Sequence, residues 1–137
     1  MRLYRLKRET TVADIGLFNA QLFVGELSDS KGNRIKGMAI LIPNRWFEMP
    51  FAVQKDDALS LSHLLKQVTP KEPSMTFSVS LGWISRFRFS LDEYLDKWLN
   101  NDGYSGRVSI YGNWIPIKIS GSAVRELSDC LERFYQS

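Results

Sequence analysis

Hydrophobic and polar residues alternate along most of this chain, which is the pattern of strands that bury one face in an antiparallel sheet. Seven segments follow this alternation, and they span residues 17–27, 35–42, 46–53, 75–81, 84–89, 108–111 and 114–119. Turn-forming residues separate several of them, including Gly32, the pair Pro43–Asn44 and the pair Gly112–Asn113. Glycine and asparagine tolerate the positive φ that tight turns need. We therefore expect hairpins between several neighbouring strands.

Apolar residues change to helical spacing in three segments. The first covers residues 56–68 and begins with two acids, which suit the positive end of a helix dipole. The second covers residues 90–99 and opens with Ser90 and Glu93, which have the spacing of a capping box. The third starts near Ser120 or Ser122 and runs almost to the C-terminus. The sequence thus predicts three amphipathic helices.

Together these elements predict an α+β fold, with one largely antiparallel sheet or two adjoining sheets and amphipathic helices on one face. We expect a single domain over residues 1–137. Residues 17–69 and 75–137 look alike when they are offset by about 66 to 69 positions, with Trp46 and Trp114 at corresponding places. Two explanations stay open: an internal duplication, giving two tandem strand–strand–helix units, or two unrelated units of similar design.

Composition narrows the class of protein. A chain of 137 residues with 44% hydrophobic and 24% charged residues can bury a sizeable core without help from a disulfide or a metal. It contains no apolar run of the roughly 18 residues that a membrane span needs, and its N-terminus lacks the apolar segment of a signal peptide. The one cysteine, Cys130, permits no internal disulfide and fits a reducing compartment. We expect a cytoplasmic protein that does not contact membranes.

The basic charge of the chain is local. The net charge is +3, and residues 1–9 alone account for it, with four basic residues against Glu9. The basic residues of this N-terminal segment are Arg2, Arg5, Lys7 and Arg8. The segment is either an edge strand or a mobile arm.

Candidate catalytic groups are scarce. His63 is the only histidine, and its neighbours do not resemble the surroundings of a known nucleophile or base. Cys130 falls on the apolar stripe of the last predicted helix, where a packing role is expected. The glycines lack the spacing of a phosphate-binding loop. The sequence therefore predicts a protein that is not an enzyme and that has no cofactor or metal site.

One charge pattern points to a binding surface. In the second half of the chain, the acidic residues fall in the predicted helices, at a helix end or in the linker before residue 74. The strand segments 74–89 and 105–119 carry basic residues and no acid. If Phe87 and Phe89 face the core, the alternate residues face outward. The side chains that we expect on the outward face are Arg86, Arg88, Arg107, Tyr111, Trp114 and Lys118. Such a face can stack single-stranded bases while its cations contact phosphates. Alternatively, these side chains only cover the solvent side of a sheet.

In the order of its elements, with a strand-rich unit followed by a helix occurring twice, the region 17–135 resembles the Whirly family of single-strand nucleic-acid binders. This resemblance rests on the order of elements and carries no individual family residue across. It implies that single-stranded DNA or RNA is the ligand.

Our leading hypothesis is a small binding protein that holds single-stranded DNA or RNA on this outward face, assisted by the basic N-terminal segment. The alternative is a protein-binding module, such as an inhibitor, an immunity protein or an accessory factor of a mobile element, that uses the same face against a protein partner. A homodimer formed through edge strands or exposed sheet faces is a third possibility.

Overall fold

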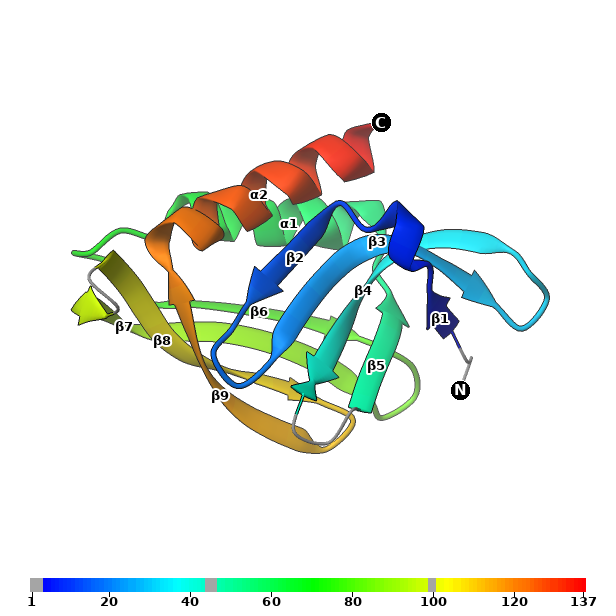
Figure 1. Cartoon of the computed structure of the whole chain (residues 1–137), viewed down its shortest axis with the longest axis horizontal. Coiled ribbons are helices and arrows are strands. Elements are labelled where there is room, and N and C mark those ends of the chain that lie inside the picture. Colours follow the sequence, from blue (N-terminus) through cyan, green and yellow to red (C-terminus); the bar gives the residue numbers. More distant parts are fainter. Residues whose placement is uncertain (1–3, 44–46, 99–100) are drawn as a thin grey trace.

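The computed structural model of the chain describes residues 4–43, 47–98 and 101–137. It confirms the α+β class, with two antiparallel sheets and two α-helices (Figure 1). Sheet A contains β1 (Tyr4–Leu6), β2 (Ala13–Gly16), β3 (Gln21–Asp29), β4 (Arg34–Ile42) and β5 (Phe47–Ala52). Sheet B contains β6 (Met75–Ser80), β7 (Arg86–Trp98), β8 (Asn101–Ile110) and β9 (Asn113–Ser120). The helices are α1 (Lys55–Lys66) and α2 (Gly121–Gln136), and a short 3₁₀ turn, η1, covers Arg8–Thr10.

Both sheets run back and forth in chain order. In sheet A, β3, β4 and β5 are neighbours, and both β1 and β2 pair with the remaining edge of β3. In sheet B, the order is β6, β7, β8 and β9. Each sheet is followed in the chain by one helix, so a strand-rich unit followed by a helix does occur twice.

The two helices lie side by side on one side of the sheets (Figure 1). Helix α1 contacts β6, whereas α2 contacts β2, β8 and β9 and therefore touches both sheets. Across the sheets, the rings of Phe51 in β5 and Phe87 in β7 lie 4.5 Å apart between centroids, and both side chains are fully buried. One core therefore joins the two sheets and the two helices.

Helices α1 and α2 occupy the segments that the sequence predicts. The hydroxyl of Ser120 accepts a hydrogen bond from the backbone N–H of Ala123, which caps the start of α2. At the other end of α2, the ammonium group of Lys36 donates to the carbonyl oxygen of Phe134 at 2.5 Å. A cation at this position also suits the negative end of the helix dipole.

The prediction of a third helix over residues 90–99 is wrong, because β7 runs through residues 90–98 as a strand and Leu99 lies outside the described residues. The apparent helical spacing has a local cause. Leu91 pairs with Gly106 and Glu93 pairs with Ser105, so Asp92 is an extra residue in a β-bulge. The bulge shifts the alternation by one position, and Leu91 and Tyr94 then both pack on the core although they are three residues apart. A bulged strand thus imitates the i, i+3 spacing of a helix.

Within the described ranges, no helix has both the length and the apolar character needed to cross a membrane.

Candidate functional site

The outward face of sheet B carries five of the six basic and aromatic side chains that alternation predicted for it. Phe87, Phe89 and Val108 point into the core and are fully buried, so their neighbours along each strand point outward. Arg86, Arg88 and Arg107 are exposed, and Lys118 is half-buried. This surface consists of the following residues, which we call the basic face: Arg86, Arg88, Arg107, Trp114, Pro116 and Lys118.

The strand register arranges the cations of the basic face along a diagonal. Arg88 lies opposite Ser109, which in turn lies opposite Trp114. One row further along, Arg107 lies opposite Pro116, and in the next row Lys118 lies opposite Ser105. Arg88, Arg107 and Lys118 therefore lie on successive strands, each displaced from the one before by two residues along the sheet. This corresponds to a spacing of roughly 8 Å between neighbouring Cα positions.

Trp114 lies beside this diagonal, in the same row as Arg88 but on β9, and its indole is available to solvent. Its side chain is 58% exposed, and the guanidinium carbon of Arg107 lies 5.2 Å from the ring centroid. This distance permits a cation–π interaction, which holds the ring and the charge together. Further along β7, the guanidinium group of Arg86 donates to the hydroxyl of Ser78 at 2.8 Å.

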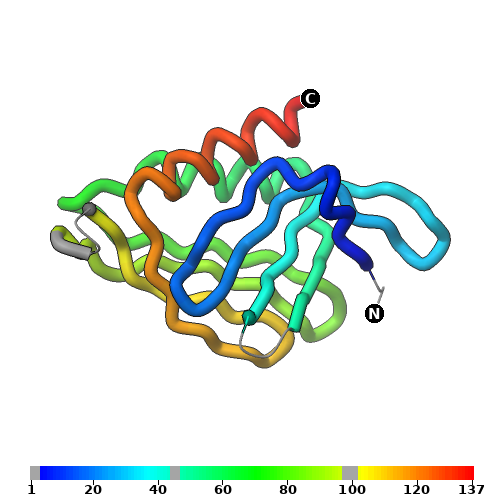
Figure 2. Tube along the Cα trace, viewed as in Figure 1, coloured from blue at the N-terminus to red at the C-terminus, as the bar shows by residue number. Residues whose placement is uncertain are grey.

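Sheet A contributes an aromatic residue that the sequence analysis missed. The turn between β2 and β3 lies beside β9 (Figure 2), where the backbone N–H of Lys118 donates to the carbonyl oxygen of Leu17 at 3.2 Å. The side-chain amide of Asn19 donates to the carbonyl oxygen of Pro116 at 2.8 Å. Between these contacts, Phe18 is 66% exposed, and the Lys118 ammonium lies 5.1 Å from its ring centroid. The expected strand 17–27 in fact begins at Gln21, because Leu17 and Ala20 close this turn.

A second missed aromatic residue stands at the turn between β6 and β7. Trp83 is 99% exposed and Ile84 is 87% exposed, while the backbone N–H of Leu81 donates to the carbonyl oxygen of Ser85 and closes the turn. Gly82, with φ of 144°, adopts a conformation that side chains disfavour. Gly82 lies between two predicted strands and marks this turn in the sequence, so the exposure of Trp83 could have been predicted.

The basic face has an acidic border, which corrects the expectation that the acids of the second half lie on helices or in loops. Because β7 continues through the bulge, Asp92 and Glu93 belong to a strand and are exposed. Glu93 lies opposite Ser105, which lies opposite Lys118, so it shares the outward face. The positive surface therefore ends at this row.

Tyr111 does not belong to the basic face. It occupies the turn between β8 and β9 with φ of 47°, and it packs against the core near Tyr4. Burial and then the nearby Tyr4 phenol raise the pKa of Tyr111 above its ordinary value. The alternation of buried and exposed positions ends where the strand ends and the turn begins. For this reason the sequence pattern wrongly placed Tyr111 on the outward face.

The basic N-terminal segment packs on sheet A instead of sheet B. Its strand β1 pairs with β3, and Arg5 is exposed there opposite Ser28. The backbone N–H of Lys7 donates to the carbonyl oxygen of Glu26. Arg8 lies 4.4 Å from the ring centroid of Phe23 and forms an ion pair with Glu48 at 2.5 Å. Arg2 and Trp46 lie outside the described residues.

His63 contacts Gln67, and Cys130 contacts Val12 and the guanidinium group of Arg133. His63 is exposed and its ring nitrogen Nε2 lies 3.1 Å from the side-chain nitrogen of Gln67. Cys130 is 7% exposed, and its sulfur lies 3.5 Å from the carbonyl oxygen of Val12. A search of the described side chains found no group of three or more His, Cys, Asp or Glu residues placed to hold a metal ion.

Comparison of the chain with models of protein families, with curated proteins and with solved structures found no match. The geometry of the basic face is therefore the basis for assigning a function.

Proposed function

We propose that this protein is a small non-enzymatic module that binds single-stranded DNA or RNA across the basic face of sheet B. The observation that carries the proposal is the stacking of the Arg107 guanidinium on the exposed ring of Trp114, between Arg88 on one side and Lys118 on the other. Phosphates favour such a row of cations, and bases favour the open face of the tryptophan.

Exposed aromatic rings favour a single strand over a duplex as the ligand. Trp114 and Phe18 each lie beside a cation of this row, and Trp83 is exposed at the turn that precedes Arg86. Bases in a duplex are stacked on one another and do not offer their faces, whereas unpaired bases stack on aromatic side chains. Both helices pack against the sheets and against each other, so neither projects into a groove as a recognition helix does.

The polar residues between the cations suit contacts to the sugar–phosphate backbone of a nucleic acid. Ser78, Ser109 and Ser105 share the outward face with the arginines and the lysine, and hydroxyls donate readily to phosphate oxygens. Among the described residues of sheet B, Glu93 brings a carboxylate to the outward face at the Lys118 end of the row. We therefore expect binding with little preference for base sequence.

The direct test is a titration of the full chain against fluorescently labelled, mixed-sequence single-stranded DNA, single-stranded RNA and duplex DNA at about physiological salt, followed by fluorescence anisotropy. We expect saturable binding of at least one single-stranded polymer and weaker binding of the duplex. Absence of saturable binding to both single-stranded polymers would refute the proposal.

The exposure of Trp83 and Ile84 favours a second candidate, a protein-binding module. Apolar side chains this exposed at a hairpin tip are typical of residues that anchor a protein partner, because burying them on association releases water from a large area. Affinity capture with and without nuclease separates the candidates. A partner that is retained after nuclease treatment and lost in Trp83→Ala supports this second function.

A further inference from the structure

A cavity of about 800 Å³ opens between the two sheets, and its lining residue Ser80 pairs with Arg86 at one end of the basic face. It lies where β5, an edge strand of sheet A, leads into α1, and where β6, an edge strand of sheet B, leads into its turn. None of the six residues of the basic face lines it. Its volume falls within the range of small-molecule sites.

The walls of the cavity are mostly apolar and aromatic. Val79 and Leu81 contribute half-buried aliphatic groups from the β6 side, and Tyr111 contributes a half-buried ring. Phe51 and Tyr135 also line the cavity but are almost fully buried. A flat apolar body would find dispersion contacts on several sides here.

Positive groups dominate the charged part of the lining. Arg34, Lys36 and Lys55 line the cavity, whereas Asp57 is its one acidic residue among those described. The ammonium of Lys36 is held by the carbonyl oxygens of Phe134 and Ser137. Neither Arg34 nor Lys55 forms an ion pair within the described ranges, so both can face an anion.

The first turn of α1 brings backbone N–H donors to the same wall, and Asp56 and Asp57 in that turn offset part of their positive field. Gln54 is the N-cap of α1 and also lines the cavity, and its side chain does not cap the helix. The N-terminal backbone N–H groups of a helix therefore lie at the cavity wall without a side-chain acceptor from the N-cap, and such groups favour negative charge.

A buried donor provides an independent indication of a ligand. Tyr135 lines the cavity and is only 5% exposed, yet its hydroxyl has no hydrogen-bond partner among the described residues. Leaving such a donor unpaired costs free energy, and an acceptor atom on a bound molecule would remove that cost.

We propose that this cavity binds a small organic anion with a flat, apolar body, whose ring packs against Val79 and Tyr111 and whose negative group faces Lys55, Arg34 and the start of α1. This site is independent of nucleic-acid binding on the basic face.

Isothermal titration calorimetry of the full chain with 1-naphthoate tests the proposal, with 1-naphthamide as the neutral counterpart of the same shape. We expect 1:1 binding of naphthoate, at least tenfold tighter than that of naphthamide. Lys55→Gln should weaken naphthoate binding about tenfold, because a charge-assisted contact is lost. Lys71→Gln removes the same charge outside the cavity and should leave the affinity unchanged.

Two further variants locate the bound molecule. Val79→Trp fills the cavity and should abolish binding, and Leu81→Trp serves if that variant does not fold. Tyr135→Phe should weaken naphthoate binding several-fold without lowering the melting temperature, because only the unpaired hydroxyl is removed. Absence of naphthoate binding at millimolar concentration, equal affinity for naphthamide, or undiminished binding by a folded cavity-filling variant would each overturn the proposal.

Discussion

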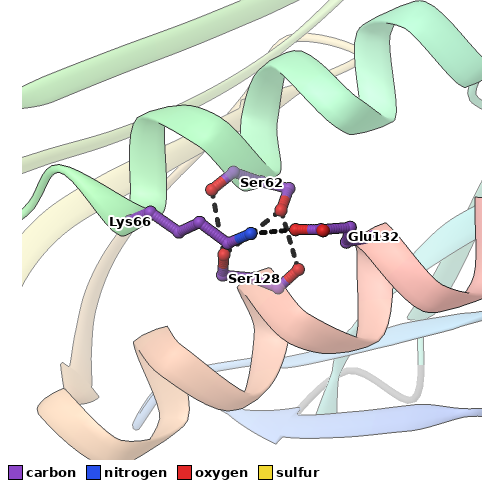
Figure 3. Close-up of polar contacts among 4 residues, drawn as sticks. All are labelled: Ser62, Lys66, Ser128 and Glu132. Atoms are coloured by element: carbon purple, nitrogen blue, oxygen red, sulfur yellow. Dashed lines mark hydrogen bonds and ion pairs between the residues drawn. The ribbon is translucent and has the colours of Figure 1, made fainter.

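Ser62 of α1 and Ser128 of α2 exchange hydrogen bonds in both directions. The Ser62 hydroxyl donates to the Ser128 carbonyl oxygen at 2.8 Å, and the Ser128 hydroxyl donates to the Ser62 carbonyl oxygen at 2.9 Å (Figure 3). Both side chains are buried, and one turn further along, Lys66 forms an ion pair with Glu132. Each of these two pairs is separated by 66 positions in the chain.

The same offset relates the buried faces of the two helices. Every buried residue of α1 has a buried counterpart 66 positions later: Ala58 and Val124, Leu61 and Leu127, Ser62 and Ser128, Leu65 and Leu131. A reciprocal contact of this kind is what two copies related by a two-fold axis form. It agrees with the offset of about 66 to 69 positions found in the sequence, and the two explanations, an internal duplication or two unrelated units of similar design, both stay open.

The serine pair should stabilise the contact between the helices. We expect Ser62→Ala and Ser128→Ala each to lower the free energy of unfolding by about 1 kcal/mol, because each removes one buried hydrogen bond. The double variant should cost less than the sum, since the two hydroxyl oxygens lie 3.2 Å apart and share their surroundings. Urea unfolding measures these values. Ser60→Ala, at an exposed position of α1, is the matched control, and an equal effect there would contradict the expectation.

Leu65 and Leu131 should be equivalent in the core. Leu65 is 1% exposed and Leu131 is fully buried, at corresponding positions of the two helices. We expect Leu65→Ala and Leu131→Ala each to cost about 2 to 5 kcal/mol of unfolding free energy, through lost burial and the cavity that remains. Chemical denaturation followed by circular dichroism tests this. A loss below 1 kcal/mol at either position would show that this helix does not pack on the core as described.

Charge and stacking on the basic face should have separable effects on nucleic-acid binding. Trp114→Ala should weaken binding by about 1 to 3 kcal/mol per stacked base and leave the salt dependence nearly unchanged. Arg88→Gln should instead flatten the slope of log affinity against log salt by up to about 0.7, the value for one phosphate contact on a single strand. Anisotropy titrations at several salt concentrations measure both. Arg5→Gln, on sheet A, is the matched charge control, and an equal change of slope there would place the ligand elsewhere.

The aromatic residues at the two ends of the basic face should extend the binding site. Trp83→Ala and Phe18→Ala should each weaken the binding of long single strands by about 1 to 3 kcal/mol, because each removes a stacking surface. Their effects should diminish as the oligonucleotide is shortened, since a short strand cannot reach both ends. Val12→Ala, which removes an exposed apolar side chain just before β2, is the control. An equal loss of affinity in all three variants would contradict a defined path of the single strand across the basic face.

Tyr135 should make stability sensitive to alkaline pH. Burial raises the pKa of its phenol above the ordinary value of 10.0, so the folded chain keeps a proton that the unfolded chain loses. The unfolded state then binds fewer protons, and the free energy of unfolding falls as pH rises above about 10, by up to about 1.4 kcal/mol per pH unit. Denaturant unfolding of wild type and Tyr135→Phe between pH 8 and 11 measures this. The variant should show a shallower decline, and parallel curves would contradict the role of Tyr135.

Local patterns in the sequence were sufficient for the fold class and for most of the basic face. Alternation predicted which side of β7, β8 and β9 is buried, and it therefore placed Arg88, Arg107 and Trp114 on the outward side. Helical spacing predicted α1 and α2. These features depend on the repeat of the backbone over a few residues, which a single segment carries by itself.

Only the tertiary structure decided how separate segments meet. The bulge at Asp92 depends on pairing between β7 and β8, and the place of Phe18 beside Lys118 depends on contact between two different sheets. Arg8 contacts Phe23 and Glu48 on sheet A, whereas its positive charge alone did not predict which sheet it would contact. Such contacts join residues far apart in the chain, and their free energy depends on which surfaces come together in space. The periodicity of one segment reports its own buried side and contains no information about the partner that covers it.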